Sequence, residues 1–210
     1  RKDLDGDLRY NLEQVLKASN RAADLVRQIL AFSRKSMQEQ RPVELNRVLR
    51  DTVQMLRASI PKTIDLKLEL PQERVMIMAD EGRIQQVLMN LCINAAQAIG
   101  DRHGQITVLL GTRELSEEDI SLYPELRPGQ FACLTVQDNG PGMSVEILAH
   151  IFEPFFTTKP VDKGTGMGLA VVDGIVKSHG GTIRVTSSPG EGATFEVFIP
   201  QLRDADNEET

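Results

Sequence analysis

Apolar residues between Asp7 and Arg34 recur in alternating steps of four and three, which is the pattern of a helix in a bundle. A single helix cannot bury such a stripe, so it needs partner helices, and we expect these to come from a second copy of the chain. A second amphipathic helix is predicted at residues 45–60, before Pro61. The same periodicity predicts further helices at residues 80–99, 144–152 and 166–181.

Alternation of apolar and polar residues predicts the strands of a sheet. The expected strands lie at residues 64–70, 74–80, 104–115 and 129–138, followed by a hairpin over 181–200 that turns at 189–192. We expect residues 74–80 to be the hairpin partner of 64–70, because the two strands are adjacent in the sequence.

Strands that mostly follow one another in hairpins, mixed with helices, favour an α+β fold over a doubly wound parallel sheet. We predict a two-layer α/β sandwich, with a mixed, mainly antiparallel sheet covered by helices on one face, preceded by a long N-terminal bundle helix. The predicted boundaries are 1–40 for the bundle helix, 41–200 for the sandwich and 201–210 for a disordered tail or linker.

Composition narrows the possible partners and the compartment. The formal net charge is −6 and no dense block of lysine and arginine occurs, so nucleic acid is not an expected partner. No apolar run approaches the roughly 18 residues that span a bilayer, and we expect a cytoplasmic domain without membrane contact. Cys92 and Cys133 each lie in an apolar run, which predicts buried thiols in a reducing cytoplasm. The three histidines lack metal-ligand spacing, and there is no zinc motif.

The predicted helix at 80–99 carries a polar stripe beside its apolar face. Its members share spacings of three and four residues: Arg83, Gln86, Asn90, Asn94 and Gln97. Asparagine is a poor helix former, and two of them in mid-helix need a reason. One interpretation is a solvated face. The other is a Mg²⁺ site, in which Asn94 ligates the ion and Asn90 touches the ion or a phosphate.

Two glycine-dense turns indicate places where the backbone approaches something closely. The first, "DNGPGM" at 138–143, follows a strand, and its aspartate could accept a hydrogen bond from an exocyclic amine. An ordinary β-turn with aspartate first is the alternative. The second, "GTGMGL" at 164–169, opens a helix and presents backbone N–H groups to an anion. Its spacing differs from the dinucleotide fingerprint, and no P-loop or Ser/Thr/Tyr kinase signature occurs.

Five motifs, in this order, resemble the N, G1, F, G2 and final glycine boxes of the ATP-binding domain of two-component sensor histidine kinases. They are "NLCINA", "DNGPGM", "FEPFFTTK", "GTGMGL" and "GEGATFEVFIP". The resemblance covers about residues 60–200. In addition, "SNRAADLVRQILAFSRK" resembles the second helix of the family's dimerisation and phosphotransfer hairpin. The same ATP-binding fold occurs in topoisomerase, chaperone and mismatch-repair ATPases, but the F box and the bundle helix favour the kinases.

The resemblance implies ATP and Mg²⁺ as ligands. It implies that Asp138 binds the adenine amino group, that Asn94 and Asn90 serve the metal and phosphates, and that Thr194 lies near the adenine. The segment "FEPFFTTKPVDKG" would be a lid, with phenylalanines as apolar anchors and Lys159 or Lys163 near the phosphates, although core packing and solvated charges explain these residues equally. The implied ATP-binding residues are Asn90, Asn94, Gln97, Asp138, Gly140, Gly142, Met143, Phe155, Lys159, Gly164, Thr165, Gly166, Met167, Gly168, Leu169 and Thr194.

The family's phosphoryl acceptor is a histidine followed by an acidic residue, and none of His103, His150 and His179 has such a neighbour. We therefore expect a fragment that binds ATP, lacks the catalytic acceptor and does not phosphorylate itself. The resemblance further implies a homodimer through the bundle helix, a response-regulator receiver domain as partner and, in the intact protein, a place in the cytoplasmic part of a sensor. Two alternatives stay open: an ATP-hydrolysing clamp, which would carry glutamate at the position of Asn90, and a non-catalytic nucleotide-binding module.

Overall fold

The computed structural model describes Leu8, Leu12 and residues 40–120, 126–159 and 165–202. Contacts divide the chain into residues 1–37 and 38–210, and the second unit contains the sheet. Most of the predicted bundle helix at 1–40 lies outside the described residues, as does the predicted tail from 203 onward. None of the described helices is long and apolar enough to cross a membrane.

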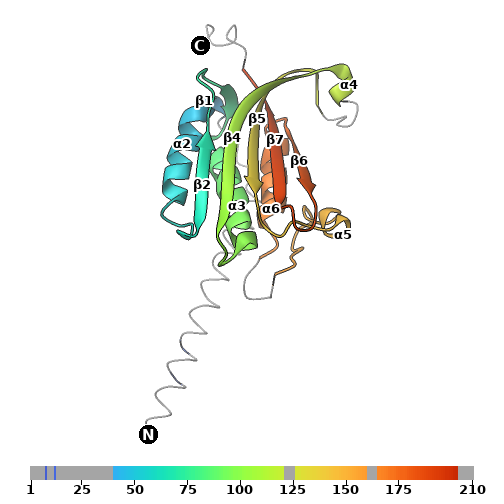
Figure 1. The fold of residues 1–210 in the computed structure, drawn as a ribbon. Helices are drawn as coiled ribbons and strands as arrows, with labels where there is room; N and C mark the ends of the chain where they lie inside the picture. The colour runs from blue at the N-terminus through green and yellow to red at the C-terminus, as the bar shows by residue number, and fades with distance from the viewer. Residues whose placement is uncertain (1–7, 9–11, 13–39, 121–125, 160–164, 203–210) are drawn as a thin grey trace. The chain divides into compact units, whose positions relative to one another are not determined.

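The second unit is built on a five-stranded sheet with the order β2-β4-β5-β7-β6 (Figure 1). Only β2 and β4 run parallel, whereas the other three pairings are antiparallel. The strands are β2 (Ile64–Glu69), β4 (Gly104–Leu115), β5 (Gly129–Asp138), β6 (Thr182–Ser187) and β7 (Ala193–Pro200). This is the mixed, mainly antiparallel sheet that the sequence predicted.

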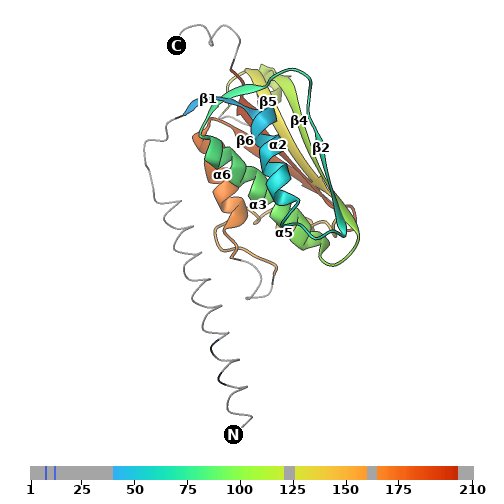
Figure 2. The same cartoon turned by 90° about the vertical axis from the view of Figure 1, so that its left-hand side faces the viewer.

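Three helices cover one face of this sheet (Figure 2): α2 (Leu45–Leu56), α3 (Glu81–Ile99) and α6 (Gly168–Ser178). Their apolar stripes meet the inward side chains of the strands in one core, which includes Leu49, Leu88, Val172, Val136 and Val197. The two-layer arrangement with helices on one face is thereby confirmed. Two short helices, α4 (Glu117–Ile120) and α5 (Val145–Leu148), lie outside this layer.

The predicted hairpin between residues 64–70 and 74–80 is wrong. Strand β3 (Met76–Ala79) pairs antiparallel with β1 (Arg41–Glu44), a strand that the sequence analysis did not predict, and β2 pairs with β4. Residues 201–202 belong to the fold, because the Leu202 amide donates to the Met76 carbonyl at 2.9 Å. The described fold thus continues two residues past the predicted boundary at residue 200.

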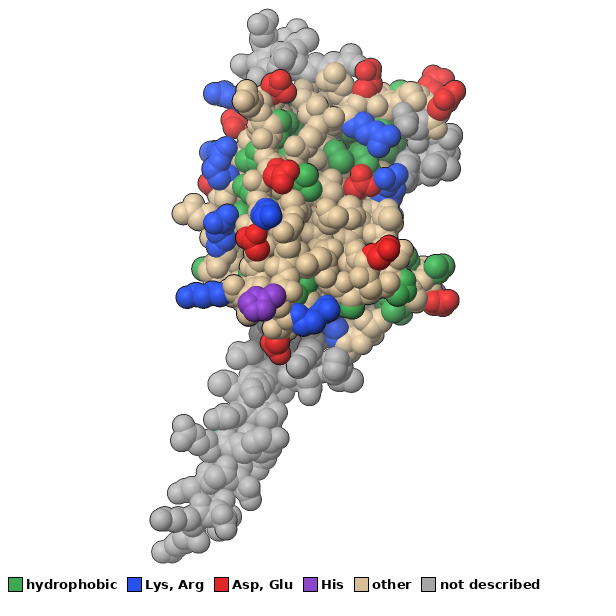
Figure 3. Space-filling view, viewed as in Figure 1, with side chains coloured by type: hydrophobic (Ala, Val, Ile, Leu, Met, Phe, Trp, Pro, Cys, Tyr) green, Lys and Arg blue, Asp and Glu red, His purple; other side chains and the backbone are tan. Residues whose placement is uncertain are grey.

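The other face of the sheet is open, and it carries uncharged polar side chains with charged and apolar ones around them (Figure 3). Its outward residues include Thr135, Gln137 and Thr194, which alternate with the inward core residues of the same strands. Near α4 this face holds a small apolar cluster of Leu115, Leu126, Phe131 and Phe198. Only on the helix-covered face can residues of the described strands and of α2, α3 and α6 form a site together.

Candidate functional site

Helix α3 presents its polar stripe to the start of α6. The helix begins cleanly because the Asp80 carboxylate accepts hydrogen bonds from the amides of Gly82 and Arg83, at 2.9 and 3.3 Å. Further along α3, the Asn90 side-chain amide donates to the Gly168 carbonyl at 3.4 Å. The Asn94 amide lies 3.4 Å from where a Cβ on Gly168 would stand. Glycine at this position therefore allows close approach between the two helices.

Lys159 places a cation on the same stripe. Its Nζ donates to Asn94 Oδ1 at 3.4 Å and also to Gln97 Oε1. Burial lowers the pKa of Lys159, because removal from water disfavours the ammonium form. The Asn94 side-chain oxygen is therefore an acceptor for a positive charge, which is the property that a Mg²⁺ ligand requires.

The start of α6 carries the positive end of the helix dipole. Among the described residues no side chain caps this helix, whose N-cap is Met167, so the amides of its first turn have no such partner. With the helix dipole and the nearby Lys159 ammonium, these amides make the region favourable for phosphate oxygens.

Asp138 ends β5 with its side chain on the helix-covered face. The residue is only 6% exposed, and its Oδ1 accepts a hydrogen bond from the Gly140 amide at 2.8 Å. Burial raises the pKa of Asp138, an effect that hydrogen bonds from the backbone of Gly140 and Ala193 partly oppose. A Cβ on Gly140 would lie 2.7 Å from Asp138 Oδ1 and 3.5 Å from the Ala98 Cβ. The turn at residues 138–143, which we call the acidic turn, therefore packs against the last turns of α3.

The two sets of predicted site residues, at the start of α6 and in the acidic turn, thus contact α3 at different positions along its axis. Asn90 and Asn94 face Gly168, and Ala98 faces Gly140. From Asn90 to Ala98 the helix rises about 12 Å at 1.5 Å per residue. Asp138 and the asparagines therefore lie on one side of the sheet, at separate positions along α3.

Two glycines lock the acidic turn to the β6–β7 hairpin turn. Gly142 has φ 68°, and a Cβ there would lie 1.9 Å from the Ser188 carbonyl oxygen. Gly192 has φ 76°, and its Cβ would lie 2.0 Å from the Asp138 carbonyl oxygen. The Gly190 amide also donates to the Pro141 carbonyl at 2.7 Å. The close approach that these glycines permit is therefore backbone against backbone, in support of Asp138.

Comparison with known proteins agrees with this geometry. Residues 79–203, more than half of the 210, match the family described as histidine kinase-, DNA gyrase B- and HSP90-like ATPase. The solved catalytic domain of histidine kinase ThkA is 31% identical with a TM-score of 0.62, over 78% of this chain and 96% of that one. The chain belongs to the two-component sensor histidine kinase family. The matched part of the chain is the ATP-binding catalytic domain of that family.

Curated relatives are longer than this kinase chain. Sensor kinase CckA of Brucella abortus (strain 2308) is 40% identical over 194 residues, which are 91% of this chain and 20% of the relative. The histidine-protein kinase AtoS of Escherichia coli (strain K12) is 36% identical over 190 residues, 90% of this chain and 28% of the relative. The chain therefore spans only 20% and 28% of the length of these two relatives.

The chain is also similar to a solved structure that contains AMPPNP. Full-length ShkA with AMPPNP has a TM-score of 0.69 at 25% identity, covering 88% of this chain and 36% of ShkA. This similarity confirms the fold.

The base of the predicted lid in the kinase domain is held by an unusual pair. Phe155 has φ 69°, rare for a side chain with a Cβ, and its amide donates to the Gly166 carbonyl at 3.0 Å. Gly166 has φ 66°, and a Cβ there would lie 2.4 Å from the Phe155 carbonyl carbon. The pair closes the loop that carries Lys159. Gly164 and Lys163 lie outside the described residues.

The phenylalanines of this segment divide into two groups. Phe152 and Phe156 pack against the main core, as the alternative of plain core packing anticipated. Phe155 is 62% exposed and is therefore not an apolar anchor within this unit. Its backbone, not its ring, holds the base of the loop.

The remaining predicted residues fall on both sides of the site. At the start of α6, Met167 is buried and Leu169 is half-buried. The Thr165 hydroxyl accepts a hydrogen bond from the Met167 amide at 3.4 Å. The Met143 amide donates to the Ser187 hydroxyl at 2.9 Å, which supports the acidic turn.

The structure does not bring Thr194 to Asp138. Ala193 is the residue paired with Asp138, and the inward positions of β7 continue with Phe195 and Val197. Because strand side chains alternate, Thr194 points to the open face. The sequence "ATFEVFIP" already indicated this orientation, because Ala193 is two residues before Phe195 and four before Val197, whereas Thr194 alternates with them.

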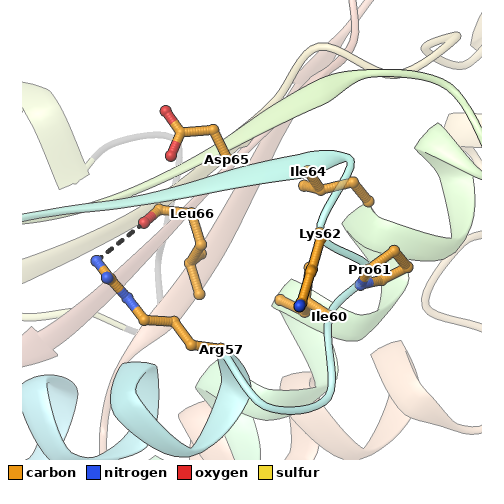
Figure 4. Close-up of a pocket in the computed structure, with 7 residues that line it drawn as sticks. All are labelled: Arg57, Ile60, Pro61, Lys62, Ile64, Asp65 and Leu66. Atoms are coloured by element: carbon orange, nitrogen blue, oxygen red, sulfur yellow. Dashed lines mark hydrogen bonds between the residues drawn. The ribbon is translucent and has the colours of Figure 1, made fainter.

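A shallow pocket lies apart from this site, between the end of α2 and the start of β2 (Figure 4). It is lined by Arg57, Ile60, Pro61, Lys62, Ile64, Asp65 and Leu66. Arg57 crosses it and donates to the Leu66 carbonyl at 3.3 Å. None of the lining residues belongs to the predicted ATP-binding set.

Proposed function

We propose that this chain binds Mg²⁺-ATP between α3, α6 and the acidic turn and donates the γ-phosphoryl group to a histidine outside the chain. The phosphoryl group then passes to an aspartate of a response-regulator receiver domain. The observation that carries this proposal is the common position of Asn90, Asn94 and Gly168 with Asp138 on one side of the sheet. A related kinase, ThkA, has been solved in complex with response regulator TrrA, at 27% identity and a TM-score of 0.68.

Each group has a chemical role in this proposal. The Asp138 carboxylate accepts a hydrogen bond from the adenine amino group, because a buried ionised acceptor binds an N–H donor strongly. The amides at the start of α6 and Lys159 hold the phosphates. Asn94 and Asn90 supply neutral oxygen ligands that fit Mg²⁺, which neutralises phosphate charge when it is bound.

Phosphoryl transfer asks mainly for positioning and charge stabilisation, and the described residues offer both. None of the three histidines precedes an acidic residue, so we place the accepting histidine outside this chain. Hydrolysis by a clamp-type ATPase is disfavoured, because the Asn90 amide cannot take a proton from water as a glutamate would.

The segment of residues 1–40 completes the proposal. We infer that it forms one helix of a dimerisation hairpin and pairs with a second copy of the chain, because of the apolar stripe between Asp7 and Arg34. The intact protein would then place this kinase domain in the cytoplasm, as part of a sensor.

The test combines calorimetry with transfer in trans. Mg²⁺-ADP is titrated into the chain, and a histidine-bearing domain of a related kinase is then supplied with labelled ATP. We expect binding by the chain, acid-labile label on the added histidine domain and none on the chain itself. Absence of binding would refute the proposal, and binding without transfer would leave a nucleotide-binding module.

Asn94→Ala and Gln54→Ala form a matched pair for this test. Both remove a side-chain amide from a helix, but Gln54 is exposed on α2, away from the site. We expect Asn94→Ala to weaken Mg²⁺-ADP binding by about 1–3 kcal/mol and Gln54→Ala to leave it unchanged. Equal affinities in the two variants would remove Asn94 from the proposed site.

A further inference from the structure

His179 follows α6 and is buried, with 6% exposure. Its Nε2 accepts a hydrogen bond from the Asp80 amide at 3.2 Å, across 99 positions of sequence. Its Nδ1 lies 2.8 Å from the Ile175 carbonyl, and the Ser178 hydroxyl is 3.3 Å from the same nitrogen. A backbone amide only donates and a carbonyl only accepts, so these partners select the neutral ring with the proton on Nδ1.

This ring joins the far ends of two helices of the site. Asp80 is the N-cap of α3, and His179 is the C-cap of α6. The helices run antiparallel, side by side in Figure 2, so that Asn90 of α3 meets Gly168 at the other end of α6. From Asp80 to Asn90 is about 15 Å of chain at helical rise. Among the described residues, polar contacts therefore join the two helices at both ends of α6.

We propose that His179 is a positioning residue that sets the register of α3 along α6 and so keeps Asn90 and Asn94 opposite Gly168. The physical reason is rigidity: a helix transmits an axial shift at its capped end to residues further along, because its rise per residue is fixed. Apolar packing between two helices tolerates small sliding, whereas a hydrogen bond at 3.2 Å does not. The claim that this register serves Mg²⁺-ATP rests on the proposed function above.

Two substitutions separate this role from general stability. In His179→Gln the amide reaches the position of Nε2 and keeps an acceptor for the Asp80 amide. In His179→Asn the shorter amide reaches only the position of Nδ1 and keeps the donor to the Ile175 carbonyl. Each retains one of the two contacts, so both should lower the melting temperature. Only His179→Asn loses the link between the helices.

The measurements are Mg²⁺-ADP affinity by calorimetry and the side-chain amide NMR signals of Asn90 and Asn94. We expect about tenfold weaker binding and shifted signals for His179→Asn, and near wild-type values for His179→Gln, in line with the loss of one hydrogen bond. Val53→Ala, in the core of α2, serves as a control of comparable stability loss and should leave both readouts unchanged.

The outcomes keep the two proposals apart. Equal affinities and unmoved signals in His179→Asn and His179→Gln would overturn the positioning role, as would an equal loss of affinity in Val53→Ala. If the wild-type chain binds no nucleotide, the proposed function fails, and the asparagine signals still decide whether His179 sets the register.

Discussion

Asp138 is the residue at which binding and stability oppose each other. Burial raises its pKa, so the folded domain holds a proton on this carboxyl at higher pH than the unfolded chain does. The ionised form therefore costs folding free energy at neutral pH. That cost declines as the pH falls through the folded-state pKa and is gone below the unfolded-state pKa.

We predict that Asp138→Asn weakens Mg²⁺-ADP binding by about 1–3 kcal/mol, because an amide oxygen is a poorer acceptor than a carboxylate. Wild-type binding should also weaken as the pH falls through the raised pKa, whereas the variant should lack this component. Calorimetric titrations of both proteins over the acidic range check this, since protonation of the nucleotide itself affects both equally. Parallel pH profiles would contradict the role of Asp138.

The same substitution should make the nucleotide-free domain more stable at neutral pH, because it removes a buried charge whose desolvation outweighs its hydrogen bonds. Urea unfolding of the free proteins at neutral pH measures this difference. A less stable variant would show that the hydrogen bond from Gly140 outweighs the burial.

The two cysteines differ in their surroundings. Burial raises the pKa of Cys92 to about 12, and it also raises that of the half-buried Cys133. The thiolate is the reactive form, so we predict slow alkylation of the native protein at neutral pH, with Cys133 modified before Cys92. Mass spectrometry of peptides after timed alkylation gives the order, and rapid modification of Cys92 would indicate that α3 opens readily. The sequence predicted two buried thiols, which is correct only for Cys92.

Helix α6 begins at the proposed phosphate site, ends at His179 and carries a glycine between them. Gly174 is exposed, and a Cβ there would meet nothing within 4 Å. We predict that Gly174→Ala raises the free energy of unfolding by about 0.5–1 kcal/mol, because alanine loses less backbone entropy in a helix. Thermal or urea unfolding measures it, and nucleotide affinity should not change.

Gly142→Ala should have the opposite effect. The backbone there has φ 68°, and a Cβ would lie 1.9 Å from the Ser188 carbonyl oxygen, so the two turns could not stay together. We expect a loss of more than about 1 kcal/mol in unfolding free energy, together with weaker nucleotide binding. A neutral result would show that the acidic turn does not need its contact with the hairpin turn.

The pairing of the strands was the main feature that the sequence predicted wrongly. Residues 64–70 and 74–80 both have strand patterns, but adjacency in sequence did not make them partners. β2 lies parallel to β4 with Ile64 opposite Gly104, a connection through α3 that local patterns do not specify. Strand β1 has only four residues and contains Pro42, so it shows no alternation of apolar and polar residues that would predict a strand.

At the scale of the whole kinase domain, a bound nucleotide would connect β5, α3 and α6. We predict that Mg²⁺-ADP at 100 times its dissociation constant stabilises the chain by about 2.7 kcal/mol. Chelation of Mg²⁺ should remove much of this gain, and it should matter less for Asn94→Ala. Thermal unfolding with and without chelator checks this. If the nucleotide stabilises the wild-type chain equally without Mg²⁺, Asn90 and Asn94 are excluded as Mg²⁺ ligands.

Sequence alone determined the features of this protein that are local or periodic. Helices α2, α3, α5 and α6, most strands, the β6–β7 hairpin and the order of the ATP-binding motifs were readable, because helix and strand periods and glycine-rich turns are set by neighbouring residues. The short helix α4 was not predicted. The choice of Asn90, Asn94 and Asp138 as candidates came from the same local chemistry.

Only the tertiary structure decided which distant residues meet. It joined Lys159 to Asn94, His179 to Asp80, and the Gly142 turn to the hairpin turn. Such contacts depend on how helices and strands pack across long stretches of chain, and on which side chain an alternating strand turns inward. A linear pattern names the groups that could act, and packing selects those that act together.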